Sequence, residues 1–191
     1  MQRTGERQLP DVPGSLVGLD IKHTQRYQWA STYTRGKKVY DVACGAGYGN
    51  LILMASSYTG FDISSEAIEY AKTYYTVGPT DRFYVEDAND MPIMDMADVI
   101  VSFETVEHIK EPEKFMKWCS LFGKTTLISS PIKRSYRMSH YHLFEYKLSE
   151  FKGAISKYFS KVDYFIQKDG VGIIYPCLDD DKGVAIALCQ P

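Results

Sequence analysis

Two segments of the chain concentrate side chains that exchange protons or bind metal ions. In SFETVEHIKEPEKF, the residues Glu104, Glu107 and His108 stand at positions i, i+3 and i+4, which places them on one face of a helical turn. In SPIKRSYRMSHYHLFEY, a loop carries His140 and His142. Each segment follows a predicted strand, so we expect both to reach the same edge of the fold. Together they could perform acid–base chemistry or hold a divalent metal.

Three interpretations of these groups stay open from the residues alone. Glu104, Glu107, His108 and His142 suit an octahedral site for Mg²⁺ or Mn²⁺, in which the metal would bind two substrate oxygens and lower the pKa of one of them. Without a metal, His108 or His140 could act as a general base. A structural role is the third interpretation, because acidic residues near a helix N-terminus are favoured by the helix dipole.

A glycine-rich turn stands earlier in the chain, in VYDVACGAGYGN. Gly45, Gly47 and Gly49 follow a short apolar run, at the place where a doubly wound fold binds an adenosine-containing ligand. A dinucleotide site favours G-x-G-x-x-G, but Asn50 occupies the last position. Asp41 would repel a pyrophosphate and attract an ammonium group. The turn therefore favours S-adenosylmethionine, which carries an ammonium group, over a dinucleotide.

Two further acids follow the next two predicted strands. GFDIS places Asp62 at the tip of the second strand, where a carboxylate can accept hydrogen bonds from both ribose hydroxyls. VEDAND places Asp87 at the tip of the third, where it can accept from an adenine amino group. Each acid alone is typical of a helix cap or a loop. Their order after the glycine turn indicates a nucleoside site.

The elements that position these groups alternate along the chain. The predicted helices lie at 19–34, 48–55, 64–76 with Ser64 as N-cap, and 112–122. Short β-branched or aromatic runs predict seven strands, at 37–42, 57–62, 81–86, 98–103, 124–130, 161–167 and 183–189. This alternation predicts an α/β fold with a doubly wound, mostly parallel sheet, and the last two runs suit an antiparallel hairpin. We expect an N-terminal arm at 1–18 and one domain at 19–191.

With these motifs in place, residues 19–189 resemble class I S-adenosylmethionine-dependent methyltransferases. The resemblance implies a Rossmann-like seven-stranded sheet with its last strand inserted antiparallel beside the sixth. It also implies that Asp41, Gly45 and Gly47 surround the methionine part of the cofactor, that Asp62 binds the ribose, and that Asp87 and Ala88 lie at the adenine. The other residues expected at the cofactor are Ala43, Cys44, Ile63 and Phe103.

A narrower resemblance concerns the acid–base segments. An E-x-x-E-H turn and a later histidine before an aromatic motif resemble the metal site of small-RNA 3′-end 2′-O-methyltransferases, and Glu104, Glu107, His108 and His142 match it. The N-terminal GER and HTQRY are similar to bacterial methyltransferases assigned to sugar or cell-surface polysaccharide modification. The family's Lys-Pro-Gly-Gly turn before the fifth strand is missing, and no substrate domain is inserted. The acceptor pocket is therefore expected from the arm, 131–147 and 169–182.

The composition and net charge of the chain indicate which classes of partner to expect. The formal net charge of −2 gives no general attraction to phosphate, so we expect no nucleic acid and no membrane, and a cytoplasmic protein with free thiols. The predicted activity is O-methylation of a sugar or small polyol, as a small-molecule or glycan acceptor. RNA is the alternative acceptor, for which Lys133, Arg134 and Arg137 are the basic candidates. A non-catalytic cofactor-binding subunit of the same fold and an oligomer that completes the pocket also stay open.

Overall fold

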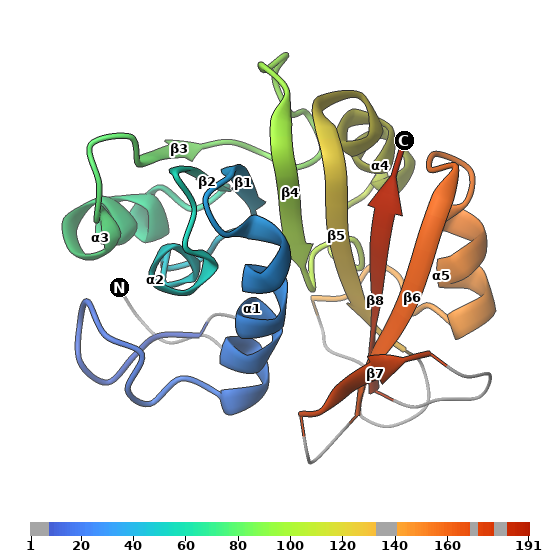
Figure 1. Cartoon of the computed structure of the whole chain (residues 1–191), viewed down its shortest axis with the longest axis horizontal. Helices are drawn as coiled ribbons and strands as arrows, with labels where there is room; N and C mark the ends of the chain where they lie inside the picture. The colour runs from blue at the N-terminus through green and yellow to red at the C-terminus, as the bar shows by residue number, and fades with distance from the viewer. Residues whose placement is uncertain (1–7, 133–140, 169–171, 178–182) are drawn as a thin grey trace.

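The computed structural model of the chain describes residues 8–132, 141–168, 172–177 and 183–191 (Figure 1). In these residues no helix combines the length and the apolar character that a membrane crossing requires. All four cysteines are free thiols, as predicted. The helices are α1 (Ile21–Thr34), α2 (Gly49–Leu53), α3 (Ser65–Tyr75), α4 (Pro112–Phe122) and α5 (Leu148–Ile155).

The described strands form one sheet with the order β3-β2-β1-β4-β5-β8-β6-β7. Pairing between neighbours from β3 to β5 is parallel, whereas β8 is antiparallel to both β5 and β6. The predicted mostly parallel sheet with an antiparallel final strand beside the sixth is confirmed. The strands are β1 (Lys38–Val42), β2 (Ser57–Asp62), β3 (Arg82–Val85), β4 (Ala97–Phe103), β5 (Gly123–Pro131), β6 (Lys161–Lys168), β7 (Ile174–Pro176) and β8 (Gly183–Gln190).

The sheet has eight strands rather than the predicted seven. The additional strand, β7, pairs antiparallel with the outer side of β6, and it lies in the segment where only a loop was expected between β6 and β8. Its three residues are too few to show an alternating apolar pattern. The last two predicted strands do pair antiparallel, but they are not joined by a simple hairpin loop.

Helix α5 was also missed by the sequence pattern. The helix has eight residues, and the residue before it is Lys147 rather than a preferred cap such as Ser or Asp. The Glu150 carboxylate still accepts a hydrogen bond from the Lys147 backbone N–H at 2.8 Å. By contrast, the predicted N-cap Ser64 accepts from the Ala67 N–H at 3.3 Å. A standard cap was therefore recognisable in the sequence, and an unusual one was not.

The sheet separates two apolar layers. Helices α1, α2 and α3 pack on one face, whereas α4 and α5 cover the other (Figure 1). Neighbouring residues of β4 divide between the faces, with Val99 in one cluster and Ile100 in the other, as the pleat of a strand requires. Because β1, β2 and β4 are parallel, their carboxyl ends share one edge of the sheet, and the loops that follow them meet there.

Close packing behind the glycine turn explains why the third of its glycines, Gly49, carries no side chain. A Cβ on Gly49 would lie 2.6 Å from both the Asp41 carboxylate and the Tyr27 ring. Both of these groups are buried. Gly49 therefore lets α2 approach β1 and α1, and the residue has this packing role whether or not a ligand is bound.

Replacing Gly49 by Ala should destabilise the protein by about 1–3 kcal/mol, because the added methyl overpacks a buried site. The matched control is Gly153→Ala in α5, where an added Cβ meets nothing within 4 Å. The control should stabilise the protein by about 0.5–1 kcal/mol, because Ala favours a helix over Gly. Urea unfolding of both variants measures the effects, and equal shifts in the two would contradict the packing role.

Candidate functional site

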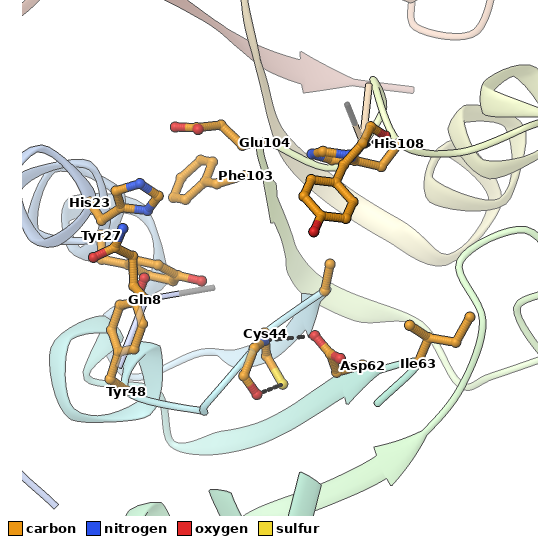
Figure 2. Close-up of a pocket in the computed structure, with 13 residues that line it drawn as sticks. Gln8, His23, Tyr27, Cys44, Tyr48, Asp62, Ile63, Phe103, Glu104 and His108 are labelled. Carbon is orange, nitrogen blue, oxygen red and sulfur yellow. Dashed lines mark hydrogen bonds between the residues drawn. The ribbon is translucent and has the colours of Figure 1, made fainter. Parts of the chain in front are cut away.

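A cavity of about 390 Å³ opens at the carboxyl ends of β1, β2 and β4 (Figure 2). Helix α1 forms one of its walls, through His23 and Tyr27. The volume is typical of a site for a small organic ligand. Six of the residues predicted at the cofactor line this cavity: Ala43, Cys44, Gly45, Asp62, Ile63 and Phe103.

Asp62 holds the glycine turn in place. Its Oδ2 accepts a hydrogen bond from the Gly45 N–H at 2.9 Å (Figure 2). Its Oδ1 accepts one from the Ser64 N–H at 2.9 Å. Gly45 has a φ of +57°, and a Cβ there would meet no atom within 4 Å. The carboxylate thus fixes the turn, and open space lies beside the turn's backbone. This open cradle next to an acid fits an adenosine-bearing cofactor.

The other predicted cofactor residues do not line the cavity. Gly47 lies in the turn with a φ of +86°, and a Cβ there would be 2.6 Å from the Ala71 Cβ of α3, so this glycine serves helix packing. Asp87 accepts hydrogen bonds from the backbone and side chain of Asn89, both at 2.8 Å. Ala88 lines a separate, smaller hollow beside Trp118. The adenine contacts of Asp87 and Ala88 therefore stay predictions.

Asp41 lies beneath the cavity rather than in its wall. It is completely buried, and it accepts hydrogen bonds from the Tyr58 hydroxyl at 2.7 Å and from the Tyr27 hydroxyl at 3.2 Å. Burial raises the pKa of Asp41 to about 7, although the two phenol hydrogen bonds oppose the rise. Tyr27 does line the cavity, so Asp41 holds one residue of the cavity wall without lining the cavity itself.

Replacing Asp41 by Asn should flatten part of the pH dependence of stability. A raised pKa means that the folded state binds the proton more tightly, so the stability from this group is full at acidic pH. That stability is lost as the pH rises from about 4 to about 7, by at most about 4 kcal/mol. Urea unfolding across this interval should show a smaller loss for the variant than for the native protein. Parallel profiles would contradict the raised pKa.

At the end of β4, Glu104 adopts a positive φ of +51°. This left-handed backbone directs its side chain to the α1 side of the cavity (Figure 2), where it forms an ion pair with the buried Arg26. Burial opposes the charge of Glu104, but Arg26 and neighbouring histidines hold its pKa below the usual value. Arg26 is itself held by Gln167 of β6, at 2.8 Å. Glu104 is therefore part of a network between α1, β4 and β6.

Three of the four predicted metal ligands come together. Ligand atoms of Glu107, His108 and His142 all lie within 4.8 Å of one another, and the rings of the two histidines are 4.7 Å apart. Leu143 and Phe144 donate backbone hydrogen bonds to the Glu107 carbonyl, at 2.8 and 3.1 Å, which fixes the second segment against the first. Glu104 is not in this cluster. His140, together with Lys133, Arg134 and Arg137, lies outside the described residues.

The contacts of His108 place a proton on one of its ring nitrogens. Its Nδ1 lies 3.0 Å from the Tyr141 carbonyl, which can only accept, so Nδ1 donates this hydrogen bond. The other ring nitrogen, Nε2, lies 4.0 Å from a Glu107 oxygen. Histidines that bind metals commonly donate their other ring N–H to a backbone carbonyl in this way.

Glu107 is buried to 1% exposure. Neither of its carboxylate oxygens has a hydrogen-bond partner within the part of the chain that the structure describes. Burial, with the nearby charge of Glu104, raises the pKa of Glu107 well above its usual value. The nearby Ser130 hydroxyl opposes this rise without reaching hydrogen-bonding geometry. A buried carboxyl of this kind is costly unless it is paired with a cation. The group therefore fits a bound divalent metal.

Several residues of the cavity were missed as functional candidates: Gln8, His23, Tyr27, Tyr48 and Tyr141. The four-residue spacing of His23 and Tyr27 is typical of residues on one face of a helix. The pattern predicts the helix but no role at a site, because the sequence does not show where α1 docks. Glu104 and Phe103 line the cavity on the same side as His23 (Figure 2).

Known proteins resemble this chain in sequence. The profile of the methyltransferase domain family matches residues 40–121. A relative from Mycobacterium tuberculosis, named "Probable S-adenosylmethionine-dependent methyltransferase", is 28% identical over 61% of this chain and 42% of its own length. The ubiquinone biosynthesis O-methyltransferase of Chromobacterium violaceum is 31% identical over 47% of this chain and 40% of its own length. This chain thus spans less than half the length of these two relatives.

Solved structures share the fold. The methyltransferase domain of bacterial CtHen1-C superposes with a TM-score of 0.70 at 21% identity, over 88% of this chain and 98% of that one. The small RNA methyltransferase HEN1 superposes with a TM-score of 0.69 at 20% identity, over 88% of this chain and 25% of that one. At such identities the likeness establishes the architecture alone.

Proposed function

Because the chain carries a class I S-adenosylmethionine-dependent methyltransferase domain, we propose that it methylates a hydroxyl group of a sugar or small polyol with help from a divalent metal. The cofactor would occupy the cavity above Gly45 and Asp62. The acceptor would enter the same cavity, between His23 on one side and, on the other, the residues Glu107, His108 and His142, which we call the carboxylate–histidine cluster.

The observation that carries this proposal is the position of His108. Its side chain lines the cofactor cavity and also belongs to the carboxylate–histidine cluster. A metal held by the cluster would therefore lie beside the reactive part of the cofactor. Methyl transfer from a sulfonium is an in-line displacement, so catalysis depends on positioning the acceptor oxygen and removing its proton.

The donor set also indicates which metals fit. One carboxylate and two imidazoles bind first-row transition metals better than Mg²⁺, which prefers oxygen ligands, so Mn²⁺ is favoured of the two predicted metals. When bound, a divalent ion supplies positive charge that lowers the pKa of a nearby acceptor hydroxyl. The remaining wall, with Gln8, His23 and Glu104, offers polar groups that can hydrogen-bond to other hydroxyls of a sugar.

The test has two steps. Calorimetry with S-adenosylhomocysteine should show binding, and its absence would reject the proposal at once. Labelled S-adenosylmethionine is then offered with methyl glycosides, ribonucleosides and short RNAs, with EDTA and after re-addition of Mn²⁺. Transfer to a glycoside that EDTA abolishes and Mn²⁺ restores is the expected result. Transfer that survives EDTA would reject the metal, and cofactor binding without any transfer would favour a non-catalytic subunit.

An RNA ribose is the second candidate acceptor. The E-x-x-E-H spacing of residues 104–108 and the later His142 favour this acceptor, because the same pattern resembles the metal site of small-RNA methyltransferases. A ribose end also presents adjacent hydroxyls to a metal. RNA binding would weaken steeply with salt, because it releases counterions, whereas binding of a neutral glycoside would not.

A further inference from the structure

One histidine of the cavity has no part in the carboxylate–histidine cluster. His23 comes from the first turns of α1 and lines the cavity. Figure 2 shows it on the same side as Glu104, across the cavity from His108, with the glycine turn and Asp62 below. An acceptor that reaches the cofactor between these walls would therefore pass His23. A catalytic role for His23 rests on the proposed function, because it requires a hydroxyl acceptor in this cavity.

The His23 ring is available for a new hydrogen bond. Its backbone N–H bonds to Asp20 within the helix, at 3.1 Å, but no described residue makes a hydrogen bond to the ring. The neighbouring polar side chains have assigned partners: Arg26 binds Glu104 and Gln167, and Gln8 accepts from the Asp20 N–H at 3.3 Å. A part-buried imidazole that faces a cavity and has no hydrogen-bond partner among the described residues is suited to accept a hydrogen bond from a ligand.

The charges around His23 suit a group that takes up a proton and later releases it. Burial lowers the pKa of His23 from its ordinary value of 6.5, so the ring is neutral at about pH 7. Among the charged groups that face it, Glu104 and Asp20 favour the protonated ring, whereas Arg26 and Lys22 oppose it. Glu104 is the stronger of the favourable two, and Arg26 fixes its position. A protonated His23 would thus be stabilised by an oriented carboxylate.

We infer that His23 is the catalytic base of this pocket and accepts the proton of the acceptor hydroxyl during methyl transfer. In this step the acceptor oxygen forms a bond to the methyl carbon, while its O–H proton moves to the unprotonated ring nitrogen of His23. The bond between the methyl carbon and sulfur breaks, and its electron pair stays on the sulfur to give neutral S-adenosylhomocysteine. Glu104 is a positioning residue that stabilises the imidazolium, and the proton then leaves to solvent.

The first experiment needs no acceptor. Histidine labelled with ¹³C in the ring is followed by NMR through a pH titration of the complex with S-adenosylhomocysteine, and the His23→Gln variant identifies which of the four histidine signals belongs to His23. The expected midpoint lies below 6.5. Glu104→Gln should move it further down, because it removes the stabilising charge. A ring that is still protonated at about pH 7 would overturn the inference, since it could not accept a proton.

The second experiment measures methyl transfer to the best acceptor of the panel. His23→Ala should slow transfer by about 100-fold or more, the usual worth of a general base, while affinity for S-adenosylhomocysteine changes less than about threefold. Added imidazole should restore part of the rate, which a merely structural role would not allow. The matched control is Gln28→Ala, on the exposed side of the same helix, with the native rate expected.

The outcomes separate the role of His23 from the proposed function. Native transfer by His23→Ala would overturn the role of His23 and leave the O-methyltransferase intact. A native protein that methylates nothing in the panel would count against the proposed function, and the NMR titration would still decide whether His23 can accept a proton.

Discussion

Replacing Glu107 by Gln should make the protein more stable at neutral pH and abolish its stabilisation by metal. Burial raises the pKa of the Glu107 carboxyl, so the folded state favours its neutral form. The stability from this group is full at acidic pH and is lost as the pH rises above about 4.5. The variant has no such loss, so its advantage should grow with pH and reach about 1–3 kcal/mol at about pH 7.5.

A bound metal should change the stability of the native protein in the opposite direction to ionisation of Glu107. A metal that binds the folded protein raises its stability, so Mn²⁺ should raise the unfolding temperature of the native protein and leave Glu107→Gln unchanged. The control is Glu111→Gln, which alters an exposed carboxylate paired with Lys114 and should keep the native response. If Glu107→Gln kept the response to Mn²⁺, Glu107 would not be a ligand.

Replacing Asp62 by Ala should weaken the binding of S-adenosylhomocysteine by about 150-fold or more. Two hydrogen bonds from ribose hydroxyls to a carboxylate contribute about 1.5–3 kcal/mol each. The variant also loses the bond that holds the Gly45 N–H, so the turn itself is less well fixed. Isothermal titration calorimetry measures the affinity directly.

The control for Asp62 separates binding from local stability. Ser64 caps α3 through its hydroxyl, and Ser64→Ala should cost about 1 kcal/mol of stability. The affinity for S-adenosylhomocysteine should nevertheless stay native, because Ser64 does not line the cavity. If both variants lost affinity equally, the effect of Asp62→Ala would come from the displaced helix and not from ribose contacts.

The glycine-turn side of the cavity was largely predictable. The order of strands and helices predicts parallel strands, and parallel strands bring their carboxyl ends to one edge. Gly45 and Asp62 therefore had to meet, although 17 residues separate them. The same reasoning predicted that His142 lies near Glu107, because each residue follows a strand and these two strands, β4 and β5, are neighbours.

The prediction was less successful where backbone conformation or docking decides the outcome. Glu104 shares the spacing of Glu107 and His108, but a positive φ directs it away from them and toward Arg26. No spacing rule shows that a residue will adopt the left-handed conformation. Asp41 was expected at the methionine part of the cofactor; it does not line the cavity, and its buried carboxylate accepts hydrogen bonds from the Tyr27 and Tyr58 hydroxyls.

The sequence by itself determined the fold class, the positions of the glycine turn and of Asp62 at the ends of neighbouring strands, and the proximity of the two acid–base segments. These features follow from local propensities and from the order of elements, which parallel pairing converts into neighbours in space. Only the tertiary structure decided that α1 brings His23 to the cavity and Arg26 to Glu104, and that Glu107 is buried without a partner among the described residues. The physical reason is that burial and helix docking depend on contacts between residues far apart in the chain, which no local pattern encodes.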